Sequence, residues 1–253
     1  TYPYTILITE DDDEVRGFLE RELSLHFKIR TVANGKDALR VLEEEEISLV
    51  VSDVMMPEMN GFELCRMIKS QLPFSHIPVI LLTALTDERQ RIFGITGGAD
   101  DYIQKPFHTD YVKIKIIHLL QERQKLRERL LEKLRDNKLL LSEPEKVESI
   151  DDTFLRKFAE QIEAVYADPE YNVEKLSETL GLSRGHLHRK IKELTGTAPV
   201  EFLRTYRLNK ATQLLRQNAY TVSEVAYRTG FSSPAYFSKC FKAVYGVTPT
   251  EYQ

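Results

Sequence analysis

The sequence places acidic side chains directly after two apolar runs that are typical of buried strands. Glu10 and Asp11 follow the run 4–9, and Asp53 follows the run 47–52. Because the carboxyl ends of parallel strands form one crevice in a doubly wound sheet, we expect these carboxylates to lie close together. Carboxylates at such range repel one another, and a bound cation relieves the repulsion. Hard oxygen ligands favour Mg²⁺, so the pattern predicts a magnesium site.

Two further polar residues end apolar runs in the same part of the chain. Thr83 follows the run 77–82, and Lys105 follows the short run 101–104. A hydroxyl and an ammonium beside carboxylates and a metal would stabilise the oxygens of a phosphoryl group. The alternative is that acids at strand ends only cap helices or face water. Five such residues at four strand ends favour a site for phosphoryl chemistry.

Residues 1–118 alternate strand and helix patterns. The first predicted helix carries Val15, Phe18, Leu19 and Leu23 on one apolar face. The predicted strands are 4–9, 27–33, 47–52, 77–82 and 101–104, and the later helices are 37–45, 62–70 and roughly 87–96. Five such units predict an α/β doubly wound, five-stranded parallel sheet covered on both faces.

A long helical pattern runs from residue 108 to about 141, and residues 142–145 are typical of a linker. Two heptad registers starting at Ile116 and Ile117 are each apolar at five of eight positions. Neither register is preferred, which favours a solvated helix over a coiled-coil dimer. The predicted division is a domain over 1–118, a helical extension and linker over 119–150, and an all-α domain over 151–253.

The all-α part contains an internal repeat. Residues 173–181 match residues 222–230 at an offset of 49, and after one inserted residue Gly196 and Pro199 match Gly246 and Pro249. Such a run of matches predicts two copies of one helix-turn-helix unit. The second helix of each copy is expected to begin near Ser183 and near Ser233.

The second helix of each copy has an apolar stripe and an opposite face that carries basic residues. The predicted buried stripes are Leu187, Ile191 and Leu194 in the first copy and Phe237, Phe241 and Val244 in the second. The outward residues are Arg184, Gly185, His188, Arg189 and Lys192, and then Pro234, Ala235, Ser238, Lys239 and Lys242. Basic side chains there can contact phosphates, and arginine can bind guanine in the major groove.

The charge distribution agrees with these two kinds of site. The 253 residues carry 35 basic and 39 acidic side chains, which is a net charge of -4 and a length that suits two domains. Residues 1–118 hold 13 basic and 20 acidic side chains, whereas residues 183–253 hold 11 and 4. The two cysteines have no metal-ligand spacing, and no apolar run approaches the roughly 18 residues that span a membrane. We therefore expect a cytoplasmic protein that binds a polyanion through its C-terminal part.

Residues 4–118 resemble the receiver domain of two-component response regulators, which has a flavodoxin-like fold. The segments that carry the resemblance are 6–12, 53–61, 81–84 and 101–107. The resemblance implies that Asp53 is the phosphoacceptor, with Thr83 and Lys105 beside it. It also implies that Glu10, Asp11, Asp53 and the backbone carbonyl of Met55 hold Mg²⁺, and that Thr83 and Tyr102 form a switch pair. Glu10 occupies a position where many members carry Asp.

Residues 151–253 resemble the AraC-family DNA-binding domain. The segments that carry this resemblance are 176–194, 222–242 and 245–249. By this resemblance, base-facing positions are occupied by Gly185, His188, Arg189, Pro234, Ala235, Ser238 and Lys239. Glycine, proline and alanine cannot bond bases through their side chains, so shape or methyl contact is expected there.

Together these features predict a transcription regulator in a phosphorelay. A histidine kinase would phosphorylate Asp53, promoting dimerisation and sequence-specific DNA binding, with no turnover of an external substrate. The alternatives are a metal-dependent phosphatase or hydrolase, and a phosphate-sink or scaffold module. The domain order resembles the cytoplasmic end of membrane-anchored hybrid sensors, and the start at Thr1 fits excision from such a parent. A free-standing response regulator remains the alternative.

Overall fold

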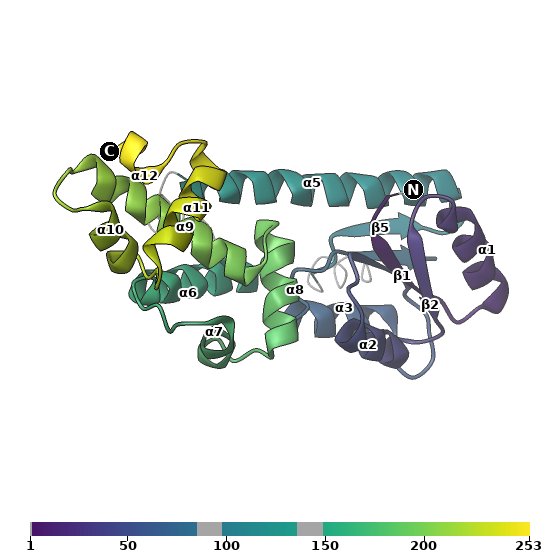
Figure 1. Cartoon of the computed structure of the whole chain (residues 1–253). Coiled ribbons are helices and arrows are strands. Elements are labelled where there is room, and N and C mark those ends of the chain that lie inside the picture. Colours follow the sequence, from purple (N-terminus) through teal and green to yellow (C-terminus); the bar gives the residue numbers. More distant parts are fainter. Residues whose placement is uncertain (1, 85–97, 136–148) are drawn as a thin grey trace. The chain divides into compact units, whose positions relative to one another are not determined.

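The computed structural model describes residues 2–84, 98–135 and 149–253 (Figure 1). The chain divides into two compact units, Thr1–Leu126 and Arg127–Gln253. We call them the N-terminal and C-terminal units. The helix predicted over 87–96 and the linker predicted over 142–145 lie outside the described residues. The predicted division at 118 and 150 stays a prediction for that reason.

The N-terminal unit is built on a five-stranded parallel sheet of order β2-β1-β3-β4-β5. The strands are β1 (Thr5–Thr9), β2 (Lys28–Val32), β3 (Leu49–Asp53), β4 (Val79–Thr83) and β5 (Asp101–Gln104). β1 and β3 are neighbours, with Thr9 opposite Ser52. The residues that follow these two strands therefore meet at one edge of the sheet. The predicted fold class is confirmed.

Helices cover both faces of this sheet (Figure 1). They are α1 (Asp13–Ser24), α2 (Gly35–Glu44), α3 (Gly61–Ser70) and α5 (Thr109–Arg135). Ile6 and Ile8 pack with residues of α1 and α5, whereas Leu7 packs on the other face with α2 and α3. Since side chains alternate between the faces of a strand, each central strand contributes to two cores. β3 is buried along its whole length.

The loops that follow β1 and β3 are held by helix caps and by one glycine. The Asp12 side chain accepts hydrogen bonds from the backbone N–H groups of Glu14 and Val15 at the start of α1. At Gly61, the first residue of α3, a Cβ atom would lie 2.1 Å from the Asp53 carbonyl oxygen. Only glycine lets the start of α3 approach the end of β3 so closely, which fixes the position of Asp53.

On two helices of this unit, the buried residues differ from those that the sequence pattern predicted. On α1, Leu19 and Leu23 are buried, but Phe18 is 43% exposed, so its predicted place on the buried face was wrong. Phe18 lies at the edge of that face, where the Arg21 guanidinium covers its ring at 5.5 Å from the centroid. On α5 the buried residues Val112, Ile116 and Leu120 pack on the sheet. That spacing of four residues matches neither heptad register alone.

The C-terminal unit is all helical and contains the two predicted helix-turn-helix motifs. Its helices are α6 (Ile150–Val165), α7 (Val173–Thr179), α8 (Arg184–Thr195), α9 (Pro199–Arg216), α10 (Val222–Arg228), α11 (Pro234–Tyr245) and α12 (Pro249–Tyr252). The first motif is α7 with α8, the second is α10 with α11, and α9 joins them (Figure 1). Each turn contains a glycine with positive φ, Gly181 at 68° and Gly230 at 78°. Among the described residues, no helix has both the length and the apolar character needed to cross a membrane.

Candidate functional site: an acidic cluster and two recognition helices

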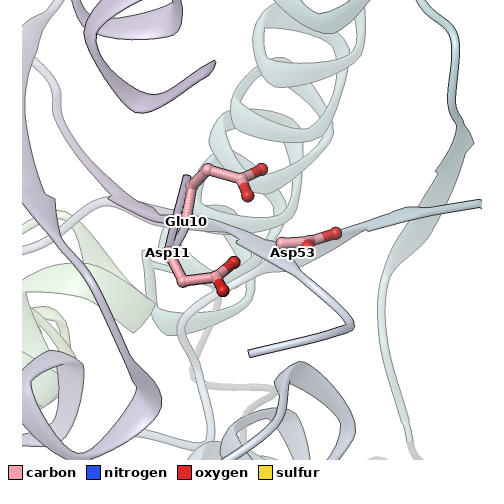
Figure 2. A group of neighbouring side chains, drawn as sticks. All are labelled: Glu10, Asp11 and Asp53. Atoms are coloured by element: carbon pink, nitrogen blue, oxygen red, sulfur yellow. The ribbon is translucent and has the colours of Figure 1, made fainter. Parts of the chain in front are cut away.

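Three carboxylates converge where β1 and β3 end. Glu10, Asp11 and Asp53 each offer an oxygen, and these oxygens all lie within 4.8 Å of one another. Figure 2 shows the three side chains directed into the same space. Glu10 and Asp53 are buried, whereas Asp11 is exposed. The predicted acidic cluster is therefore present, and Asp11 connects it to solvent.

Lys105, which follows β5, joins two of these carboxylates. Its Nζ atom lies 2.9 Å from Glu10 Oε2 and 2.9 Å from Asp53 Oδ1. Burial acts to lower the pKa of the Lys105 ammonium, but its bonds to the two carboxylates outweigh burial and raise that pKa. Burial raises the pKa of Glu10, and the nearby Asp53 charge adds to the effect while Lys105 opposes it. The cost of burying the Glu10 carboxylate therefore exceeds what its contact with the Lys105 ammonium returns.

Thr83 and Tyr102 lie on the neighbouring strands β4 and β5. Thr83 is buried at the end of β4, one residue beyond Leu82, which is the partner of Asp53 in the sheet. Tyr102 is half-buried against the core that contains Cys65, and burial raises its pKa to about 12. Met55, whose backbone carbonyl was predicted to bind Mg²⁺, is 71% exposed. The roles of these three residues stay predictions.

The recognition helices are α8 and α11, the second helix of each motif. Ser183 and Ser233 cap them through bonds to the N–H groups of His186 and Tyr236. On α8 the predicted stripe of Leu187, Ile191 and Leu194 is buried. On α11 Phe237 and Phe241 are buried, but Val244 is 51% exposed, so that prediction was wrong. Cys240 takes the third buried place, because α9, α10 and α12 cover the face that contains it and Phe241.

The ten predicted outward residues lie on the accessible sides of these two helices. The exposed residues are Arg184, Gly185, His188, Lys192, Ala235, Lys239 and Lys242, and the half-buried residues are Arg189, Pro234 and Ser238. Arg184 Nη1 lies 2.7 Å from Glu174 Oε1 on α7, and both side chains are exposed. A phosphate of a nucleic acid could replace Glu174 as the partner of Arg184 at little cost, since exposed ion pairs are weak.

Comparison with known proteins assigns both units. The family of response regulator receiver domains matches residues 6–117, and a helix-turn-helix domain family matches residues 176–253. The chain thus combines a response regulator receiver domain with an AraC-type helix-turn-helix domain. Both families are regulatory rather than catalytic.

Similar proteins contain one or both domains. Histidine kinase P4 of Formosa agariphila is 39% identical over 249 residues, which cover 98% of this chain and 18% of that protein. The transcriptional regulatory protein GltR of Pseudomonas aeruginosa is 44% identical over 121 residues, covering 47% of this chain and 50% of GltR. The signal receiver domain of a histidine kinase from Syntrophus aciditrophicus is 38% identical, with a TM-score of 0.46, and covers 47% of this chain and 91% of that one. The chain thus spans half or less of the two full-length relatives.

Sequence reasoning missed a buried lysine in the helix-turn-helix domain. Lys190 on α8 is fully buried, with its Nζ 2.6 Å from Asp151 Oδ1 and 5.1 Å from the centroid of the Phe154 ring. Asp151 and Phe154 belong to α6, so this contact attaches α6 to the first recognition helix. The helical spacing could have predicted this burial, because Lys190 lies three residues after the buried Leu187 and next to the buried Ile191.

Proposed function

We propose that this chain is a transcription regulator whose DNA binding is controlled by phosphorylation of Asp53. The observation that carries the proposal is the contact of Lys105 with Glu10 and Asp53, at 2.9 Å each, beside the carboxylate of Asp11. A carboxylate nucleophile with an adjacent ammonium and an acidic metal site suits transfer of a phosphoryl group. The match to the receiver family supports this assignment.

The donor set fits Mg²⁺. Three carboxylates with oxygens within 4.8 Å offer hard, negatively charged ligands, and burial raises the pKa of Glu10 despite its contact with Lys105. Glu10, Asp11, Asp53 and the carbonyl of Met55 would hold the ion. When bound, Mg²⁺ would neutralise charge on the phosphoryl oxygens.

The residues of the chain would then carry the transfer. An Asp53 carboxylate oxygen attacks the phosphorus of a phosphohistidine, the P–N bond breaks, and an aspartyl phosphate forms. The Lys105 ammonium and the Thr83 hydroxyl would stabilise the phosphoryl oxygens. The added charge would draw Thr83 and then Tyr102 inward, changing the surface around β5. We propose that this changed surface promotes dimerisation, together with the long helix predicted over 108–141.

DNA binding is assigned to the two recognition helices. Each carries accessible basic residues, such as Lys192 on α8 and Lys242 on α11, that can contact phosphates. His188 and Arg189 give α8 the capacity to read bases, whereas Pro234 and Ala235 limit α11 mainly to shape and methyl contacts. Two motifs in one chain would occupy successive major grooves on one face of DNA, roughly 34 Å apart.

The partner that donates the phosphoryl group would be a histidine kinase domain. A similarity that extends over 98% of this chain into a protein named as a histidine kinase supports a hybrid sensor, with the kinase in the same polypeptide. DNA binding requires a cytoplasmic location for these two domains.

The test is incubation of the full chain with Mg²⁺ and a small acyl phosphate, followed by intact-mass spectrometry. We expect a gain of one phosphoryl group by the native protein and none by Asp53→Asn. A control variant, Asp110→Asn, changes an exposed carboxylate of the same unit and should still gain the group. Modification of Asp53→Asn to the native extent would show that the assignment is wrong.

A further inference from the structure

The two turn glycines of the helix-turn-helix repeat have similar backbones but different surroundings. Gly181 and Gly230 occupy equivalent positions in the repeat, with φ of 68° and 78°. A Cβ atom on Gly181 would meet nothing within 4 Å. A Cβ atom on Gly230 would lie 2.1 Å from the Tyr166 carbonyl oxygen and 2.8 Å from Arg207 Nε. The turn of the second motif is therefore in close contact with another part of the domain, and the turn of the first motif is open.

The groups that touch Gly230 belong to the end of α6 and to the joining helix α9. Arg207 donates hydrogen bonds from Nε to the Tyr166 carbonyl at 2.8 Å and from Nη2 to the Asp168 carbonyl at 2.6 Å. Tyr166 is the C-cap residue of α6. The guanidinium thus ties the end of α6 to α9, at the point where the Gly230 turn packs. We call this the Arg207–Gly230 contact.

A continuous path of contacts runs from one recognition helix to the other. Lys190 on α8 is bonded to Asp151 at the start of α6, and Tyr166 caps the other end of α6. Tyr166 and Arg207 pack on Gly230, which lies in the turn just before α11. Beside this contact, a cavity of about 320 Å³ lies between the two motifs, and Val173 and Tyr236 line it from either side. The Arg207–Gly230 contact therefore lies at the cavity that separates the two motifs.

We propose that the Arg207–Gly230 contact fixes the distance and rotation between the two recognition helices, and so selects the spacing of the two DNA elements that the domain accepts. This inference rests on the proposed DNA binding. One inserted base pair moves the second element by roughly 3.4 Å along the duplex and rotates it by about 35°. Two motifs that are held rigidly cannot contact both elements after that shift, whereas two motifs that move relative to each other can. Arg207 is thus a positioning residue that touches no base.

The experiment uses the full chain and DNA duplexes that carry the selected site with zero, one or two base pairs added between its elements. The native protein should bind the unaltered spacing roughly tenfold more tightly than a spacing changed by one base pair, comparable to a mismatched base. Arg207→Met keeps the aliphatic stem and removes the donors, and Gly230→Ala inserts the clashing Cβ. Both should reduce that ratio to about threefold or less, with an unchanged base preference within each element.

Two matched controls separate positioning from general loss of structure. Gly181→Ala imposes the same backbone demand in open space, and Arg216→Met removes the donor of a 2.7 Å hydrogen bond from α9 to the Tyr252 hydroxyl of α12. Both controls should keep the native spacing ratio. A ratio that stays native in Arg207→Met, or that falls equally in the controls, would overturn the inference.

A measurement without DNA keeps the inference testable if Gly230→Ala does not fold or if the native chain binds no DNA. Spin labels at Lys192→Cys on α8 and Lys239→Cys on α11 occupy exposed positions, while Cys65 and Cys240 are buried. The distance distribution between the labels should be narrow in the native background and broader in Arg207→Met. Absence of DNA binding would refute the proposed function alone, whereas an unchanged distribution would refute the role of the Arg207–Gly230 contact.

Discussion

Replacement of Lys105 by methionine should destabilise the receiver domain, because it removes the cation that lies between two buried carboxylates. Breaking a buried ion pair by removing one partner costs about 3–5 kcal/mol. The Lys105 side chain is 26% exposed, whereas those of Glu10 and Asp53 are 2% and 9% exposed. Solvent screening of the lysine therefore reduces the expected loss to about 2–3 kcal/mol in free energy of unfolding at pH 8.

The loss should depend on pH through Glu10. The pKa of this carboxyl is raised in the folded protein above its ordinary value of 4.5, so the folded state binds the proton more tightly than the unfolded chain. The contribution of Glu10 to the free energy of unfolding is therefore present at low pH and is lost as the pH rises through the raised pKa of this carboxyl. Without Lys105 that pKa rises further, while Lys105 itself stays charged across the window in the native protein. The destabilisation by Lys105→Met should thus shrink as the pH falls from about 8 toward 4.5, the ordinary pKa of a glutamic acid.

Hydrogen exchange of the central strands, with a metal chelator present, measures this loss in the full chain. Peptides that contain Leu7 of β1 and Val50 of β3 report unfolding of the receiver core. The control is Lys113→Met, which breaks an ion pair with the exposed Asp110 and should cost far less than Lys105→Met, because exposed ion pairs are weak. Equal losses in the two variants, or a Lys105→Met loss that grows as the pH falls, would refute the reasoning.

Four further outcomes are expected. Gly61→Ala should destabilise the receiver by about 3 kcal/mol, since its Cβ would lie 2.1 Å from the Asp53 carbonyl oxygen. The same hydrogen-exchange experiment would measure this loss. A loss of stability below that of Lys113→Met would contradict the close approach. In a binding-site selection, Arg189→Ala should change the preferred sequence at one or two base pairs, and an unchanged preference would remove Arg189 from base readout. Lys242→Ala should weaken all sites alike and reduce the slope of log affinity against log salt by about one, whereas a changed sequence preference would contradict a phosphate contact. Sedimentation with and without the acyl phosphate should show dimers only after phosphorylation, and a monomer at DNA-binding concentrations would count against a dimeric active form.

The sheet and its acidic cluster were predictable because both follow from local patterns. Continuous apolar runs define the buried strands, and each candidate residue follows one of these runs directly. The parallel order then brings Glu10, Asp11 and Asp53 together without further information. The contact of Lys105 with two carboxylates required the strand order, since Lys105 lies 95 residues from Glu10.

The features that the sequence did not disclose depend on packing between elements. Phe18 and Val244 are apolar residues at the edges of helical faces, and their exposure is decided by what lies opposite. The burial of Lys190 depends on a carboxylate 39 residues away in α6. The repeat predicted equivalent glycines at Gly181 and Gly230, but only the fold shows that one of them packs against Tyr166. Periodicity identifies a face, and tertiary contacts decide how far it is buried.

The most direct test of the central claim is the affinity of the full chain for its selected DNA site, measured with Mg²⁺ before and after addition of a small acyl phosphate. The account predicts that the native protein binds at least about tenfold more tightly after phosphorylation, equivalent to about 1.4 kcal/mol. Asp53→Asn should show the same affinity before and after. An equal gain in both proteins, or no gain in a native protein that mass spectrometry shows to be phosphorylated, would contradict control of DNA binding through Asp53.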